Sequence, residues 1–156
     1  MHLRKHLGPI HLYIGLSRQR RLIGVNSRID VPNKHMLMWD FDGQAAAIPP
    51  YLALDLKIRE HRLPPIYLLD SSPFHFHAYC FVGMDWREAF RLVEETPGVD
   101  PVFLKLAYLR GHFTLRIQDK RRGVLRLREA IPGLSDEHFD PLQLKPELCQ
   151  YWTKKR

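Results

Sequence analysis

Residues 36–43 read MLMWDFDG, an apolar run that contains two carboxylates and ends at a glycine. The run favours a β-strand, on which side chains alternate between the two faces. Asp40 and Asp42 are therefore expected on one face, and Trp39 and Phe41 on the other, where their rings can enter a core. Two neighbouring carboxylates repel each other unless a positive group lies between them. A pair of divalent ions between the two carboxylates would relieve the repulsion, and phosphoryl transfer is the usual chemistry of such a pair. The alternative is a strand end that faces solvent and runs into an Asp-Gly turn, which needs no ion.

The length and charge of the chain limit what it can be. Its 156 residues fit one domain, over 1–156, with a sizeable core. A formal net charge of +7 and a pI near 9.6 suit a polyanionic partner, although a basic soluble protein would have the same balance. Cys80 and Cys149 are too few for a disulfide framework, so a reduced cytoplasmic location is expected. No apolar segment follows the basic start and none has the length of a membrane span, so neither a signal peptide nor membrane association is expected.

The hydrophobic pattern and the turn residues predict an α+β fold. The predicted strands are 11–16, 36–41, 66–70, 75–82, 113–117 and 124–130, and the predicted helices are 51–61, 84–96, 102–109 and 146–154. We expect 66–70 and 75–82 to form a hairpin and 124–130 to pair with 113–117. This order suggests a mainly antiparallel sheet with helices on one side, of the ferredoxin-like or RRM-like type.

Two of the predicted helices have an apolar pattern that indicates which side faces the core. Leu52 and Leu56 are spaced for one face of the helix 51–61. Trp86, Phe90 and Val93 are expected to face inward from the helix 84–96. Asp85 is the expected N-cap of that second helix.

A second motif, His75-Phe76-His77, lies in the predicted strand 75–82. The two imidazoles share one face of the strand and could bind a metal ion or a phosphate. An exposed polar face of a sheet would produce the same pattern. Ser72 lies just before this strand.

Two further segments contain charged residues that could act on a nucleotide. Asp100 precedes Pro101 and is a good helix N-cap, which by itself says nothing of catalysis. Arg116 lies in an apolar strand, and Lys120 begins a basic turn. An ordered arginine with a mobile lysine near acidic groups would bind a triphosphate, and a basic hairpin turn in water is the alternative.

Taken in order, these motifs resemble the catalytic palm of the archaeo-eukaryotic primase superfamily, which includes PrimPol-like enzymes and many plasmid and phage primases. The family has Asp-x-Asp or Asp-x-Glu on an apolar strand, then serine and histidine, then an apolar residue followed by aspartate. The matching positions here are Asp40 with Asp42, Ser72 with His77, and Val99-Asp100. PrimPol-like members continue with an aromatic-leucine-arginine strand and a basic turn, which 113–116 and Lys120 resemble. Many members have serine where this chain has His75.

The resemblance implies a single minimal primase-polymerase domain that adds ribonucleotides or deoxyribonucleotides to a DNA or RNA template and primer. Asp40, Asp42 and Asp100 would be the catalytic ligands of two Mg²⁺ or Mn²⁺ ions. The residues implied to bind the incoming NTP or dNTP are His77, His75, Ser72, Arg116 and Lys120. An accessory replication protein or helicase is an expected partner.

Two other functions remain open on the sequence. His75 and His77 also fit the His-hydrophobic-His motif of rolling-circle replication and transposition nucleases, with Tyr151 as a nucleophile on a helix. A non-catalytic nucleic-acid-binding module would use exposed aromatic rings and a basic cluster. That cluster, which could also guide a template, comprises Arg18, Arg20, Arg21 and Arg28.

Overall fold

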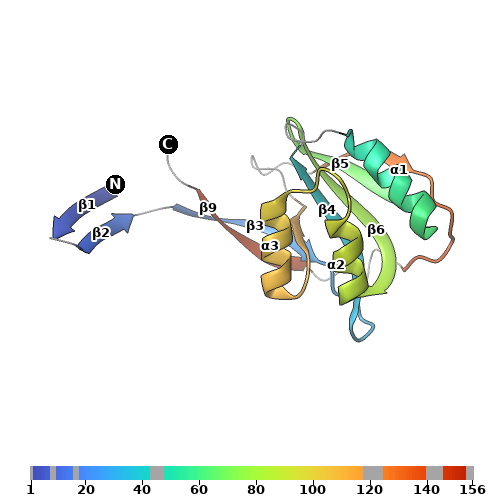
Figure 1. Ribbon diagram of the computed structural model, residues 1–156, viewed down its shortest axis with the longest axis horizontal. Helices are drawn as coiled ribbons and strands as arrows, with labels where there is room; N and C mark the ends of the chain where they lie inside the picture. The colour runs from blue at the N-terminus through green and yellow to red at the C-terminus, as the bar shows by residue number, and fades with distance from the viewer. Residues whose placement is uncertain are drawn as a thin grey trace.

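The protein is α+β, with antiparallel sheets and flanking helices (Figure 1). The computed structural model describes residues 2–7, 10–15, 18–42, 48–117, 125–139 and 146–153, with side chains described within 24–42, 48–117 and 125–139. The strands are β1 (His2–Leu7), β2 (Ile10–Gly15), β3 (Arg18–Asn26), β4 (Lys34–Asp42), β5 (Ile66–Ser72), β6 (His75–Asp85), β7 (Thr114–Arg116), β8 (Arg126–Ile131) and β9 (Pro146–Thr153). The helices are α1 (Pro50–His61), α2 (Trp86–Glu94) and α3 (Pro101–Arg110).

The largest sheet has four strands in the order β4-β6-β5-β8. The chain runs β4, α1, β5, β6, α2, and β6 lies between β4 and β5, which is the split βαβ arrangement. In a complete ferredoxin-like sheet the fourth strand lies beside the first, which is β4 here. The fourth strand, β8, lies beside β5 instead, so the α+β class and the antiparallel sheet are confirmed but the full ferredoxin-like order is not found.

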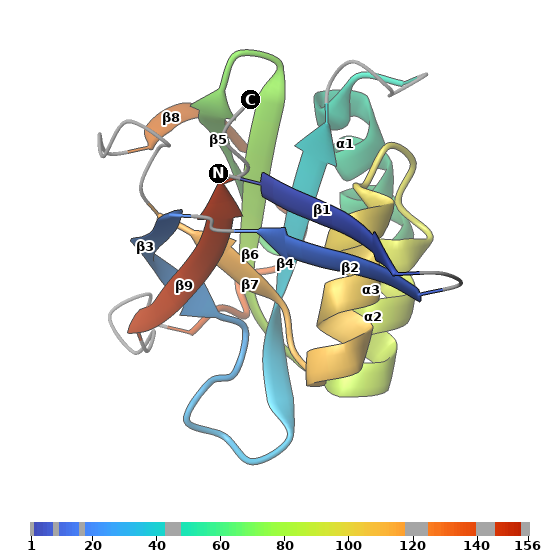
Figure 2. The ribbon, with the colours of Figure 1, turned by 90° about the vertical axis from the view of Figure 1, so that its left-hand side faces the viewer.

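The two faces of the four-stranded sheet are covered by different layers. The face that contains Leu37, Trp39 and Phe41 is closed by the helices, and all three side chains are fully buried. The Nε1 atom of Trp39 donates a hydrogen bond of 3.0 Å to Oγ1 of Thr96, directly after α2. The other face is crossed by a second sheet of order β7-β3-β9 (Figure 2). β1 and β2 form a separate hairpin (Figure 1).

Two expectations about strands are wrong. β8 pairs with β5 rather than with β7, and β7 pairs with β3. The one buried residue of β8, Ile131, lies opposite the buried Ile66, so core packing selects the partner. The expected helix 146–154 is a strand, β9, because its Tyr, Trp and Thr residues suit a ladder with β3 that overrides the local helical pattern.

The buried face of α1 also differs from expectation. Leu52 and Leu56 are about half exposed, and the buried residues are Ala53, Leu54, Lys57 and Ile58. Lys57 fits this face because its aliphatic stem is buried while its Nζ atom pairs with Glu60 at 2.8 Å.

Helix α2 keeps its expected inward face. Val93 is buried, and Trp86 and Phe90 pack against the core with Phe113. Asp85 precedes the helix but makes no capping bond, and it pairs with Lys34 at 3.4 Å instead. None of the helices in the described part of the chain is long and apolar enough to cross a membrane.

Cys80 is a buried free thiol on the helix-covered face of β6. Burial raises the pKa of this thiol to about 12. It therefore stays protonated at neutral pH and has little reactivity as a nucleophile.

The bond between Trp39 and Thr96 provides a test of how the helix layer is attached. Thr96 also donates to the carbonyl of Leu92 at 2.8 Å and is 3% exposed. Replacing Thr96 with Val leaves the indole N–H buried without its acceptor, which costs about 1–3 kcal/mol of unfolding free energy. Thr96→Ser keeps the hydroxyl and should cost less than about 1 kcal/mol. Urea denaturation of both variants checks this, and equal losses would contradict it.

His35 makes the stability of the fold depend on pH. The side chain is 5% exposed, its Nδ1 atom lies 2.9 Å from Oγ of Ser27, and its ring packs against Trp86. Burial, together with the positive charge of Arg28 and the nearby His112, lowers its pKa from 6.5 to about 4.

The unfolded chain therefore takes up this proton near pH 6.5, whereas the folded protein resists it until about pH 4. Unfolding free energy should fall as the pH drops through this window, by about 3 kcal/mol in total. His35→Gln, which cannot take up the proton, should show a flatter profile in denaturant titrations. His138→Gln, at an exposed position, serves as the control and should keep the wild-type slope. Identical slopes in all three proteins would contradict the prediction.

Candidate functional site

The register of β4 with β6 brings two sequence motifs together. Asp40 lies opposite His77, and Asp42 lies opposite His75. Residues directly opposite each other in an antiparallel pair share a face of the sheet. The Nε2 atom of His77 is 3.7 Å from Oδ1 of Asp40, and the Nδ1 atom of His75 is 3.7 Å from Oδ1 of Asp42. At this distance each pair is an electrostatic contact rather than a hydrogen bond.

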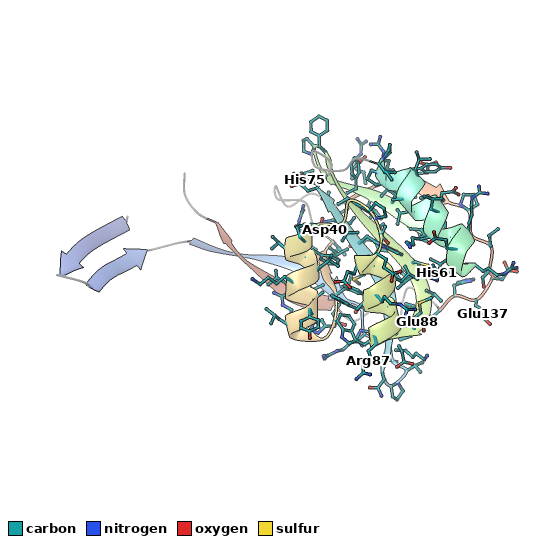
Figure 3. The ribbon with its side chains drawn as sticks, in the orientation of Figure 1. Asp40, His61, His75, Arg87, Glu88 and Glu137 are labelled. Carbon is teal, nitrogen blue, oxygen red and sulfur yellow. The ribbon has the colours of Figure 1, made fainter. Side chains whose placement is uncertain are left out.

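The two Asp–His pairs differ in their access to solvent. In the inner pair, the side chain of His77 is 2% exposed and that of Asp40 is 29% exposed. In the outer pair, His75 is 37% exposed and Asp42 is 53% exposed. Figure 3 shows His75 nearer than Asp40 to the end of the β5–β6 hairpin. The site therefore runs from a buried end to an open end along two neighbouring strands.

Asp100 reaches the site from the other edge of β4. Its backbone N–H donates to the carbonyl of Asp40 at 2.8 Å, and Val99 forms an antiparallel bridge with Phe41. This register puts the backbone of Asp100 opposite that of Asp40, but among the described residues Asp40, Asp42 and Asp100 do not form a group of side chains arranged to hold a metal ion. Its Oδ1 atom accepts the N–H of Val102 at 2.8 Å and so caps α3, as the Asp-Pro sequence predicts. One carboxylate oxygen thus has a structural role.

Arg116, at the end of β7, lies over the same face. The Oη atom of Tyr79, which alternation puts on the face of His77, donates to the Arg116 carbonyl at 3.5 Å. The guanidinium donates to the carbonyl and the Oγ atom of Ser71, at 3.3 and 3.2 Å. Arg116 is 6% exposed, so this cation is held in place rather than solvated. Its positive charge lies over the face that bears the aspartates.

The closed end of the β5–β6 hairpin borders the outer Asp–His pair. Ser72 lies opposite His75, and Ser71 is the extra residue of a bulge between Asp70 and Ser72. The Oγ atom of Ser72 is buried and has no hydrogen-bond partner within the described residues. The bulge turns Ser71 toward Arg116, as bulges commonly redirect side chains near functional sites.

The basic residues predicted to contact nucleic acid do not form a single cluster with the Asp–His pairs in the described part of the structure. Arg28 forms a bridge with His35, which is five residues or about 17 Å along β4 from Asp40. Arg18, Arg20 and Arg21 lie in β3 where it pairs with β9. Lys120 lies outside the residues that the structure describes.

Tyr151 lies in β9, opposite Arg20, and not on a helix. Its strand pairs with β3 over Arg18–Val25, along the edge of β3 opposite to β7. The helical setting expected for a tyrosine nucleophile is therefore absent at this position.

The donor chemistry of the site suits hard divalent cations. Carboxylate oxygens are the ligands that Mg²⁺ prefers, and imidazole also binds Mn²⁺. In the described part of the chain, no group of three or more His, Cys, Asp or Glu side chains is arranged to hold a metal ion. Mg²⁺ often binds through one or two carboxylates, with substrate phosphates and water as its other ligands. Asp40 and Asp42 fit that partial kind of site.

The comparisons with known proteins do not indicate a family for this chain. No protein-family model matches the sequence, and neither the curated proteins nor the solved structures yield a match. The site must therefore be interpreted from its own geometry.

Sequence reasoning missed the part that Ser71 takes in this site. The Ser71-Ser72 pair is visible in the sequence, but the bulge that separates the roles of the two serines depends on how β5 pairs with β6. The sequence shows two adjacent serines before a turn that contains proline. This pattern does not indicate which of the two serines faces Arg116.

The two roles of Asp100 can be separated by substitution. Asp100→Ala removes the cap of α3 and should lower the unfolding free energy by about 1 kcal/mol. Asp100→Asn keeps a capping oxygen and should stay within about 0.5 kcal/mol of the wild type. Denaturant titrations of the two variants measure the difference. A loss in Asp100→Asn as large as in Asp100→Ala would show that the charge, and not the cap, stabilises the fold.

Proposed function

We propose that this protein is a nucleotidyltransferase of the primase-polymerase kind, which adds nucleotides to a DNA or RNA strand. The observation that carries the proposal is the β4–β6 register, which sets Asp40 and Asp42 beside His77 and His75. Asp100 joins Asp40 through a backbone hydrogen bond of 2.8 Å. The Asp-x-Asp and His-x-His motifs, which are far apart in the sequence, thus share one face of one sheet.

The carboxylates would hold the divalent ions. Asp40 and Asp42 come from one strand, and Asp100 would contribute its Oδ2 atom, since its Oδ1 atom caps α3. When bound, Mg²⁺ or Mn²⁺ would lower the pKa of the 3′-hydroxyl of a strand and neutralise charge on the leaving pyrophosphate. The open position of Asp42, which is 53% exposed, gives a nucleotide access to this end of the site.

The basic groups would orient the triphosphate. Arg116 is held by Ser71 over the site, and its fixed charge would offset phosphate charge without the entropy loss of ordering a mobile side chain. His77, buried in the β6 strand, would donate to a phosphate oxygen from a fixed position. His75 stands where many primase-like proteins have serine and would contact the outer phosphates.

Primer extension in the presence of Mn²⁺ tests the proposal. Wild type should lengthen a labelled primer, and the Asp40→Asn/Asp42→Asn double variant should lose at least about 10²–10³-fold in rate, because the charges that support the reaction are removed. The melting temperature should not fall, since a repulsion between like charges is relieved. Asp136→Asn, at an exposed position outside the site, is the matched control and should retain full activity.

Asp100→Asn adds a sharper comparison because it keeps the helix cap. A large rate loss with an unchanged melting temperature would assign the Asp100 charge to the reaction. The proposed nucleotidyltransferase activity would be refuted if wild type extended the primer with neither Mn²⁺ nor Mg²⁺. Full activity of the double variant would also refute it.

The tyrosine nuclease remains the second candidate, because His75 and His77 share a face of β6. Tyr151→Phe separates the two enzymes. A nuclease would lose covalent attachment to DNA, whereas a polymerase would keep incorporating nucleotides. A module that only binds nucleic acid would bind with strong salt dependence and no requirement for a metal ion.

A further inference from the structure

We propose that Phe74 is a stacking platform for a nucleobase at the open end of the site. Phe74 and Pro73 form the two-residue loop of the β5–β6 hairpin, between Ser72 and His75. The Phe74 side chain is 65% exposed and lies outside the core cluster of the described residues. It directly precedes His75, so the residue lies at the end of the hairpin that flanks the outer Asp–His pair. The inference rests on the proposed function.

The backbone at Phe74 is strained, and the fold does not explain the strain. Its φ is +63°, and the other non-glycine residues of the described chain with positive φ are Asn33 and Arg62. Asparagine tolerates this conformation, and Arg62 forms the left-handed C-cap of α1. In a turn with proline at the second position, a positive φ at the third is normally met by glycine. A bulky aromatic residue here is unfavourable for folding.

A second unfavourable feature lies beside the first. The Oγ atom of Ser72 is buried with no hydrogen-bond partner in the described part of the chain. Strained residues cluster at functional sites, and a buried polar atom without a partner in a native protein calls for an explanation such as a bound group. Both features occur at the hairpin end that flanks the outer Asp–His pair. Contact with a ligand would explain both the strain at Phe74 and the unpaired hydroxyl of Ser72. The exposed aromatic ring indicates that this ligand has a planar group.

A nucleobase is the planar group that fits this position. Stacking of a base on an aromatic side chain tolerates any sequence, because every base has a π face. The base could belong to the incoming nucleotide or to the nucleic-acid strand, and the two sources share this chemistry. Stacking on Phe74 would hold the base while the phosphates reach His75, His77 and Arg116.

Four variants of the full chain test the inference. Phe74→Gly removes the ring and the strain, so its melting temperature should equal or exceed that of wild type. Phe74→Leu keeps the strain and an apolar side chain but has no π face, and Phe74→Trp keeps a π face. Tyr108→Leu removes an aromatic ring that is 71% exposed on α3 and serves as the control.

The first measurement is binding of a fluorescein-labelled thymidine oligonucleotide and of an abasic strand of equal length. Phe74→Gly and Phe74→Leu should raise the Kd for the oligonucleotide about tenfold and leave the Kd for the abasic strand unchanged. Phe74→Trp and Tyr108→Leu should bind as wild type does. A rise in the oligonucleotide Kd, without a rise in the KM for the incoming nucleotide, would assign the stacked base to the nucleic-acid strand.

The second measurement is the KM for the incoming nucleotide in primer extension. A rise of about tenfold in Phe74→Leu, without a rise in the oligonucleotide Kd, would assign the stacked base to the nucleotide. Unchanged Kd and KM in Phe74→Leu, or equal weakening for the abasic strand, would overturn the stacking platform. Wild type that binds the oligonucleotide but incorporates nothing would refute the proposed function, and the binding measurement would still decide the role of Phe74.

Discussion

The antiparallel pairing of β4 with β6 is the constraint on which the candidate site depends. This register sets Asp40 opposite His77 and Asp42 opposite His75. A slip of one residue would move all the side chains of a strand to the opposite face. Such a slip would move the ring of Trp39 away from the helix layer and turn two carboxylates into the apolar core beneath the helices, so the core enforces the same register that assembles the site. The geometry of the charged groups is therefore a consequence of apolar packing on the opposite face.

The same strand also links the helix layer to the site. Trp39 is bonded to Thr96 on one face of β4, and the next residue, Asp40, accepts the backbone N–H of Asp100 at the strand edge. Thr96 and Asp100 belong to the short connection between α2 and α3. Because this connection is bound at both points, the third carboxylate is positioned by the packing of the helices on the sheet. Its capping of α3 is part of that attachment and does not by itself imply chemistry.

Unfavourable local features concentrate at one end of the sheet. The bulge at Ser71, the buried hydroxyl of Ser72 and the positive φ of Phe74 occur within four residues of hairpin. The opposite end of β4, where His35 packs against Trp86, shows ordinary burial of a neutral imidazole. Because folded proteins are only marginally stable, backbone strain and unpaired buried polar atoms persist where other interactions offset their free-energy cost. This contrast separates a part of the sheet that serves packing from one where packing does not account for the local strain.

The sequence by itself determined the α+β class, the strand that contains Asp40 and Asp42, the hairpin of the two histidines, and the cap at Asp100. These features depend on contacts within a few residues, such as period-two alternation, a Pro-containing turn and an Asp-Pro helix start. Only the tertiary structure decided that the histidines face the aspartates, that Ser71 holds Arg116, that β8 pairs with β5, and that the segment with Tyr151 is a strand. Each of these depends on pairing between distant segments, whose register and partners are selected by the packing of the whole core and leave no local mark in the chain.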